Sequence, residues 1–135
     1  MKQLKLLLIA LSLAILTACQ VISPVFVDYN GVRMDVAKWI NGHQLLSMQQ
    51  KRSMVQLAKA QQALYRFEQQ TVVQQEQIII NNQVALHCAE PYLSAKQIAQ
   101  LQDQIFEPQE KAQALHTLQI ESAKVKVDLS QARCE

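Results

Sequence analysis

The sequence predicts an all-α fold, either an antiparallel helical hairpin or a small helical bundle with a long first helix. Leucine, alanine, glutamine and lysine are abundant, and all four favour helix. Only two glycines occur in 135 residues, which argues against a β-rich fold with many tight turns. Apolar residues also recur every three or four positions in several segments, which is the spacing of one helix face.

The first expected helix extends from about residue 32 to residue 75, after a turn at Asp28 to Gly31. Its apolar face is predicted to contain Leu57, Ala60, Leu64, Phe67 and Thr71. If unbroken, this helix would be about 65 Å long at 1.5 Å per residue. Gly42 is a candidate break, so a kink or a separate short first helix is the alternative.

The second expected helix covers about residues 76–89 and buries Ile80, Val84 and Cys88. It should end at Glu90, because the following Pro91 disfavours helix in the residue before it. The next helix should begin after Ser94, which has the capping-box spacing to Gln97. Its expected apolar face comprises Ile98, Leu101 and Ile105.

The last expected helix begins at Pro108, a residue that suits the first helical turn. Glu107 and Glu110 would lie near its positive end. Residues at spacings of three and four continue the apolar face almost to Cys134, namely Leu115, Leu118, Ser122, Val125, Leu129 and Ala132. The pattern therefore predicts two long amphipathic helices with a shorter pair between them.

Residues 1–18 have the organisation of a secretory signal. Lys2 and Lys5 precede the apolar run 6–16, which is too short to span a bilayer, since spanning takes about 20 residues. Leu16-Thr17-Ala18-Cys19 then resembles the lipobox of bacterial lipoproteins at each of its four positions. The resemblance implies cleavage between Ala18 and Cys19, followed by acylation of Cys19. An ordinary secreted protein with a cysteine beside the cut is the alternative.

Acylation would make the lipid the membrane anchor, because several acyl chains together hold a protein firmly. In the lipoprotein family an aspartate after the cysteine favours retention at the inner membrane. Gln20 occupies that position here, so the resemblance implies an outer-membrane protein facing the periplasm. The lipidated segment would be residues 19–31 and the helical domain residues 32–135. The apolar stretch Val21 to Val27 would either cover the helices or rest on lipid headgroups.

Removing residues 1–18 leaves 117 residues with eleven basic and eleven acidic side chains. This balance, with few aromatic residues and no basic stripe evident along the chain, argues against a nucleic-acid partner. A small, near-neutral domain in the cell envelope is the expected product.

Cys88 and Cys134 remain as a pair once Cys19 carries lipid. In an oxidising compartment such a pair commonly forms a disulfide, which would stabilise the fold by roughly 4 kcal/mol. Two buried free thiols are the alternative. A zinc site with His87 and His116 is disfavoured, because residues 87 and 88 point apart on a helix and no C-x-x-C spacing occurs.

No catalytic motif, cofactor signature or metal site is apparent, and His43, His87 and His116 lie in no recognised catalytic pattern. Tyr29, Trp39, Tyr65 and Phe67 are expected either in the core or in an exposed patch that binds a partner. The turn at Tyr29-Asn30-Gly31, followed by Trp39, resembles the start of a family of uncharacterised helical bacterial lipoproteins. That resemblance implies a helical lipoprotein and no activity.

These features together predict a lipid-anchored envelope protein with a structural or protein-interaction role, through a protein partner or through self-association. We expect this role because so small a chain cannot bury all of the apolar surface of its long amphipathic helices. A binding module for a lipid or other apolar ligand is the first alternative. An assembly-assisting lipoprotein is another alternative, and an enzyme is not expected.

Overall fold

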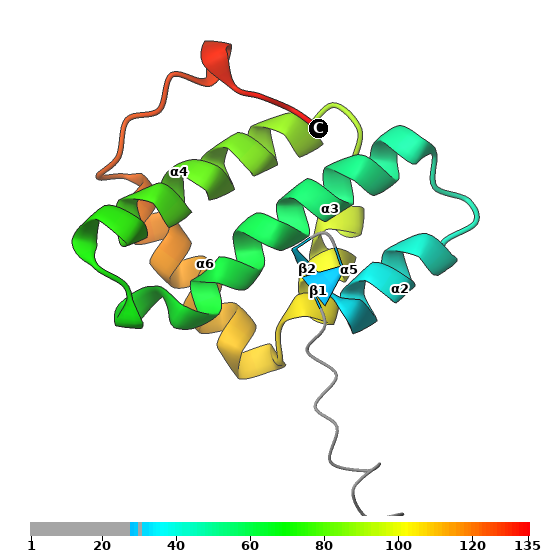
Figure 1. Cartoon of the computed structure of the whole chain (residues 1–135), viewed down its shortest axis with the longest axis horizontal. Helices are drawn as coiled ribbons and strands as arrows, with labels where there is room; N and C mark the ends of the chain where they lie inside the picture. The colour runs from blue at the N-terminus through cyan, green and yellow to red at the C-terminus, as the bar shows by residue number, and fades with distance from the viewer. Residues whose placement is uncertain (1–27, 30) are drawn as a thin grey trace, which may run out of the picture.

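The computed structural model describes residues 28, 29 and 31–135 (Figure 1). Two short strands, β1 (Asp28–Tyr29) and β2 (Val32–Arg33), precede α2 (Met34–Gly42), α3 (Met48–Gln62) and the 3₁₀ segment η1 (Ala63–Gln69). They are followed by α4 (Val72–Ala89), α5 (Ala95–Ile105), α6 (Pro108–Ser122) and the 3₁₀ turn η2 (Leu129–Gln131). The prediction of an all-α small helical bundle is confirmed.

The helix expected over residues 32–75 is not continuous. It is divided into α2, α3 and η1, with a first break just after Gly42, where His43 is extended. Ser47 then begins α3 in a capping box, in which its hydroxyl accepts from Gln50 N at 3.2 Å. Each cap satisfies main-chain donors at a new helix start, so the chain can change direction there at little cost.

The second division falls where Thr71 was expected on the apolar face. Thr71 is exposed and is the N-cap of α4, accepting from Gln74 N at 3.3 Å, while Gln70 before it is extended. The α4 helix therefore begins four residues earlier than predicted and folds back against α3 as an antiparallel hairpin (Figure 1).

The α3 helix is the centre of the bundle. It packs against α4 on one side and α2 on the other, and α5 lies behind it in Figure 1. The α6 helix packs against α4 and η1. Fully buried large side chains at the centre include Ile40, Met54, Leu57, Ile79, Leu101 and Ile105. The predicted apolar residues Leu57, Ala60, Leu64 and Phe67 are all buried, which confirms that face of the first segment.

The buried face of α4 differs from the prediction. Cys88 is buried as expected, but Ile80 and Val84 are only half-buried, and Ile79 and Asn82 occupy the core instead. Because α4 contacts both α3 and α6, its buried face is wider than a single row of residues at spacings of three and four.

The last helix is shorter than predicted, because α6 ends at Ser122. Residues 123–135, which we call the C-terminal strap, begin with a turn at 123–124 and contain no regular secondary structure apart from η2. From Lys124 to Asp128 the valines alternate with charged residues, and the valines are half-buried while the charged residues are exposed. This period of two is typical of extended chain.

The turn expected at residues 28–31 is a minimal hairpin. Asp28 pairs with Arg33 and Tyr29 with Val32, and Gly31 has a φ of 80°. Glycine suits this left-handed conformation because it lacks a Cβ atom.

The predicted capping box at the start of α5 is present: Ser94 Oγ accepts from Gln97 N at 3.2 Å, and Gln97 Oε1 accepts from Ser94 N at 2.8 Å.

Replacing Ser94 by alanine should lower the free energy of unfolding by about 1 kcal/mol, because one main-chain donor loses its acceptor. Urea unfolding measures this difference. The Ser94→Asp variant retains an acceptor and should stay within about 0.5 kcal/mol of the parent; equal losses in both variants would contradict the capping role.

Candidate functional site

The predicted lipidation and cleavage residues, Cys19 and Ala18, lie outside the described residues, as does the apolar stretch 21–27. The described part of the chain begins at Asp28, so the structure describes the domain that acylated Cys19 would anchor and not the anchor itself.

The Cys88–Cys134 disulfide predicted from the cysteine count is present, with 5.4 Å between the two Cα atoms. Cys88 is buried in the last turn of α4, whereas Cys134 lies on the exposed strap. The bond therefore fastens the end of the strap to the C-terminal end of α4. Figure 1 shows the strap running from the end of α6 back to this point.

Polar contacts with α3 hold the end of the strap beside the disulfide. Gln56 donates from Nε2 to Arg133 O at 2.9 Å and accepts from Glu135 N at 3.1 Å. Gln49 donates to Glu135 O at 3.2 Å, and Lys59 Nζ lies 3.3 Å from Glu135 Oε2. These groups are solvent-exposed, and each such contact contributes little to stability. The disulfide is therefore the main interaction that holds the end of the strap against the bundle.

A groove of about 530 Å³ lies between the strap and the α3–α4 pair, and we call it the strap groove. Its apolar lining comes from all three segments, and comprises Ala60, Ala63, Ile80, Val84, Val127 and Ala132. The half-buried state of Ile80 and Val84 follows from this position, because they face the groove rather than the bundle core.

The four predicted partner-binding aromatics are not gathered into one patch. Phe67 is a core residue, 6% exposed, so the core alternative applies to it. Trp39 is half-buried on α2 and its ring lies 4.4 Å from that of His43. Tyr65 is 40% exposed on η1 and packs 5.1 Å from Phe106. Tyr29 lies in β1, opposite Val32.

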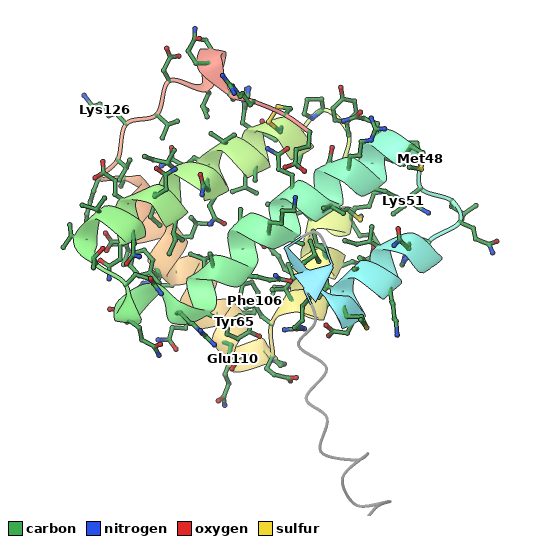
Figure 2. The ribbon with its side chains drawn as sticks, in the orientation of Figure 1. Met48, Lys51, Tyr65, Phe106, Glu110 and Lys126 are labelled. Atoms are coloured by element: carbon green, nitrogen blue, oxygen red, sulfur yellow. A yellow bond between two sulfur atoms is a disulfide. The ribbon has the colours of Figure 1, made fainter. Side chains whose placement is uncertain are left out.

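Tyr65 belongs to a polar cluster at the C-terminal end of α5. Figure 2 shows Tyr65, Phe106 and Glu110 together. The Tyr65 hydroxyl lies 2.7 Å from Ile105 O and 3.0 Å from Glu110 Oε2, so its single proton has two competing acceptors. Burial, followed by the Glu110 carboxylate, raises the pKa of the Tyr65 phenol above its ordinary value of 10.0. Arg33 donates to Gln104 O and Ile105 O, which helps to cap the same helix end.

The ion pair between Arg33 and Asp35 makes the free energy of unfolding depend on pH in the acid range. The Arg33 guanidinium, 2.6 Å from Asp35 Oδ1, holds the pKa of that carboxyl below its ordinary value of 3.8. The Asp35 pKa is lower in the folded state than in the unfolded state. The ion pair therefore stabilises the fold above pH 3.8, and this stabilisation is lost as the pH falls through the folded-state pKa.

We expect the Asp35→Asn variant to be less stable than the parent at pH 6, and this difference to shrink towards pH 2. Urea unfolding across that pH range measures both. Asp103→Asn is the matched control, because Asp103 also forms an exposed ion pair, 2.7 Å from Lys111, but its carboxyl contributes no contact to Arg33. A difference between parent and Asp35→Asn that stays constant with pH would contradict this role of the ion pair.

A basic stripe is present although the sequence analysis expected none. Arg52, Lys59 and Arg66 follow one another at intervals of seven residues, or about two helical turns, along α3 and η1. Besides the strap groove, Lys59 lines two further grooves: one of about 560 Å³ shared with Arg52, and one of about 940 Å³ shared with Arg66. Lys51 and Arg33 add to these two grooves, so we define the basic stripe as Arg33, Lys51, Arg52, Lys59 and Arg66.

Neither a metal-binding cluster nor a membrane-spanning helix is found in residues 28–135, apart from residue 30. No group of three histidine, cysteine, aspartate or glutamate side chains there is arranged to hold a metal ion. Both thiols considered for zinc are joined in the disulfide. Among the helices of the described chain, none is long and apolar enough to span a membrane.

Comparisons of this chain with protein-family models, with curated proteins and with solved structures found no match. Its function is therefore argued from its own residues.

Three features of the surface were missed by the sequence analysis, namely the strap groove, the basic stripe and the exposed apolar side chains at the helix ends. Leu45, Met48, Val72 and Val73 are between 67% and 98% exposed. The seven-residue interval of Arg52, Lys59 and Arg66 was the available signal for the stripe. The strap groove had no such signal, because it depends on where residues 123–135 return across the bundle.

Proposed function

We propose that this chain is a lipid-anchored protein of the bacterial cell envelope, held by acylated Cys19 at the periplasmic face of the outer membrane. The observation that carries the proposal is Leu16-Thr17-Ala18-Cys19 after a basic and apolar leader. The Cys88–Cys134 disulfide supports it, because disulfides persist in oxidising compartments such as the periplasm. Gln20 supports the outer rather than the inner membrane.

The intact mass of the full-length protein extracted from bacterial membranes tests the anchor. We expect the loss of residues 1–18 and the added mass of acyl chains on Cys19. A Cys19→Ser variant is the control and should gain no lipid. An uncleaved chain, or a cleaved chain with an unmodified Cys19, would contradict the proposal.

The role that we propose is binding to a protein, either a partner or a second copy of this chain, without catalysis. Val72 and Val73 support this role, because they are consecutive residues in the first turn of α4 and are 80% and 76% exposed. Removing such adjacent apolar side chains from water would favour association. Tyr92, at the α4–α5 connection, is a further exposed aromatic that suits an interface.

Analytical ultracentrifugation of the chain from Gln20 onwards tests self-association, and every residue of the described core lies within it. We expect a dimer that Val72→Ser/Val73→Ser converts to monomer. Leu45→Ser is the matched control. Leu45 is also exposed, but it lies before the N-terminus of α3, whereas Val72 and Val73 lie after its C-terminus. A parent protein that is monomeric at high concentration would rule out the self-association form of the proposal.

The strap groove favours a second candidate function, the binding of an apolar ligand such as a lipid chain. Its volume of about 530 Å³ falls in the range of small-molecule sites. Native mass spectrometry of the protein from its host should then show a bound molecule, which Ala132→Phe should exclude by filling the groove from the half-buried strap side. Protein without any bound molecule would count against this candidate.

A further inference from the structure

The basic stripe carries more positive than negative side chains. Its two grooves are lined by five cationic side chains and by a single acidic one, Glu135, which pairs with Lys59. Asp35 pairs with Arg33 at the edge of the stripe. Arg52 and Arg66 are exposed and have no ion pair among the residues that the structure describes. The stripe thus retains a net positive charge and is suited to an anionic surface.

The chain enters the fold at this stripe. A Cβ atom at Gly31, the tip of the β1–β2 hairpin, would lie 3.5 Å from the Lys59 side chain. Eight residues separate Cys19 from Asp28, so the acylated cysteine would be at most about 30 Å from the hairpin. The anchor therefore confines the stripe to a narrow layer above the membrane, and this raises its effective concentration at the lipid headgroups.

An apolar side chain lies at one end of the stripe. Met48 is 67% exposed and lines the same groove as Lys51 and Arg52 (Figure 2). Cations beside an exposed apolar side chain are the combination that favours binding in the interface of an anionic bilayer.

From these observations we infer that the basic stripe docks onto the anionic phospholipid headgroups of the membrane that holds the anchor. The inference rests on the proposed function, because acylated Cys19 brings that membrane within reach. Docking orients α3 along the bilayer surface and leaves the exposed Val72 and Val73 of α4, which line neither groove of the stripe, available to partners.

Lysine acetylation of the lipidated full-length protein tests the docking. The protein, extracted from bacterial membranes, is reconstituted into vesicles of phosphatidylcholine alone or of equal parts phosphatidylcholine and phosphatidylglycerol. A membrane-impermeant acetylating reagent then modifies exposed lysines, which are quantified by mass spectrometry. Lys51 and Lys59 report on the stripe, and Lys126 on the strap is the internal control, at the opposite end of the molecule from Lys51 in Figure 2.

We expect phosphatidylglycerol to reduce the acetylation of Lys51 and Lys59 relative to Lys126. Raising the salt from about 0.1 M to about 1 M should abolish this protection, because the Debye length falls from roughly 10 Å to roughly 3 Å. Equal acetylation ratios in the two kinds of vesicle would overturn the inference.

Two matched variants separate the stripe from the overall charge. Arg52→Gln/Arg66→Gln leaves both reporting lysines in place, and should lower the ratio of docked to undocked protein about 25-fold, since each cation near an anionic surface contributes about 5-fold. Lys96→Gln/Lys124→Gln removes the same charge outside the stripe, keeps Lys126 as the internal control, and should leave the protection of Lys51 and Lys59 unchanged. Equal loss of protection in both variants would overturn the inference.

The acylation of Cys19 and the docking of the basic stripe can be contradicted separately. A protein with acylated Cys19 and no protection by phosphatidylglycerol retains the proposed function and overturns only the docking. A protein without acyl chains overturns the proposed function, and the docking inference falls with it.

Discussion

Reducing the Cys88–Cys134 bond should lower the free energy of unfolding by roughly 4 kcal/mol. The two cysteines are 46 residues apart, and the loop-closure entropy removed from the unfolded chain corresponds to about this value. Urea unfolding with and without a thiol reductant measures the loss. The expected effect is large because typical domains of this size are stabilised by only about 5–15 kcal/mol.

The Cys88→Ala/Cys134→Ala variant provides the control for this prediction. It should unfold at low urea in both conditions, because it has no bond for the reductant to break. In the reduced parent, main-chain amides at the end of the strap should also exchange with solvent faster than those of α3, since only exposed polar contacts then hold residues 133–135. Identical unfolding of oxidised and reduced parent would contradict the stabilising role of the bond.

Replacing Gln61 by methionine should raise the free energy of unfolding by about 2 kcal/mol. Gln61 lies on α3 with a fully buried side chain, and neither Nε2 nor Oε1 has a hydrogen-bond partner among the described residues. Burying an amide without a partner is costly, whereas methionine has a similar length and fills the same space without polar atoms. Urea unfolding of parent and variant measures the difference.

Gln62→Met is the matched control, at the next position of the same helix. Gln62 accepts from Arg33 N at 2.9 Å and donates to Gly31 O at 3.2 Å, so this variant loses two hydrogen bonds. It should therefore be less stable than the parent by about 1 kcal/mol. If Gln61→Met loses as much stability as Gln62→Met, the Gln61 amide is satisfied in solution and the prediction is wrong.

Local signals in the sequence predicted the elements whose stabilising contacts are themselves local. Ser94 and Gln97 are three residues apart and form the predicted cap. Leu57 and Leu64 belong to one helix face, and their burial follows from the spacing. The Cys88–Cys134 bond followed from counting cysteines under an assumed oxidising compartment.

The elements that were predicted wrongly depend on contacts between distant segments. Asn82 is polar, yet it is fully buried because its Nδ2 donates to Ala60 O on α3 at 2.8 Å. The division of the first segment is an exception, because local capping boxes at Ser47 and Thr71 mark the new helix starts, whereas Thr71 was predicted to lie on the apolar face. The strap ends α6 early because its valines pack in alternation against the bundle, and no pattern within residues 108–135 indicates which surface they will meet.

The position of the disulfide decides how this fold would respond to a mechanical load. A protein tethered at Cys19 and bound to a partner through its strap would be pulled from both ends. Force would then extend the chain from the tether to Cys88 and along the strap back from Cys134, because the covalent bond carries the tension from one cysteine to the other. The part of the 46-residue interval that contains α5 and α6 would be shielded from stretching, so the bundle could lengthen under load and still retain part of its folded structure.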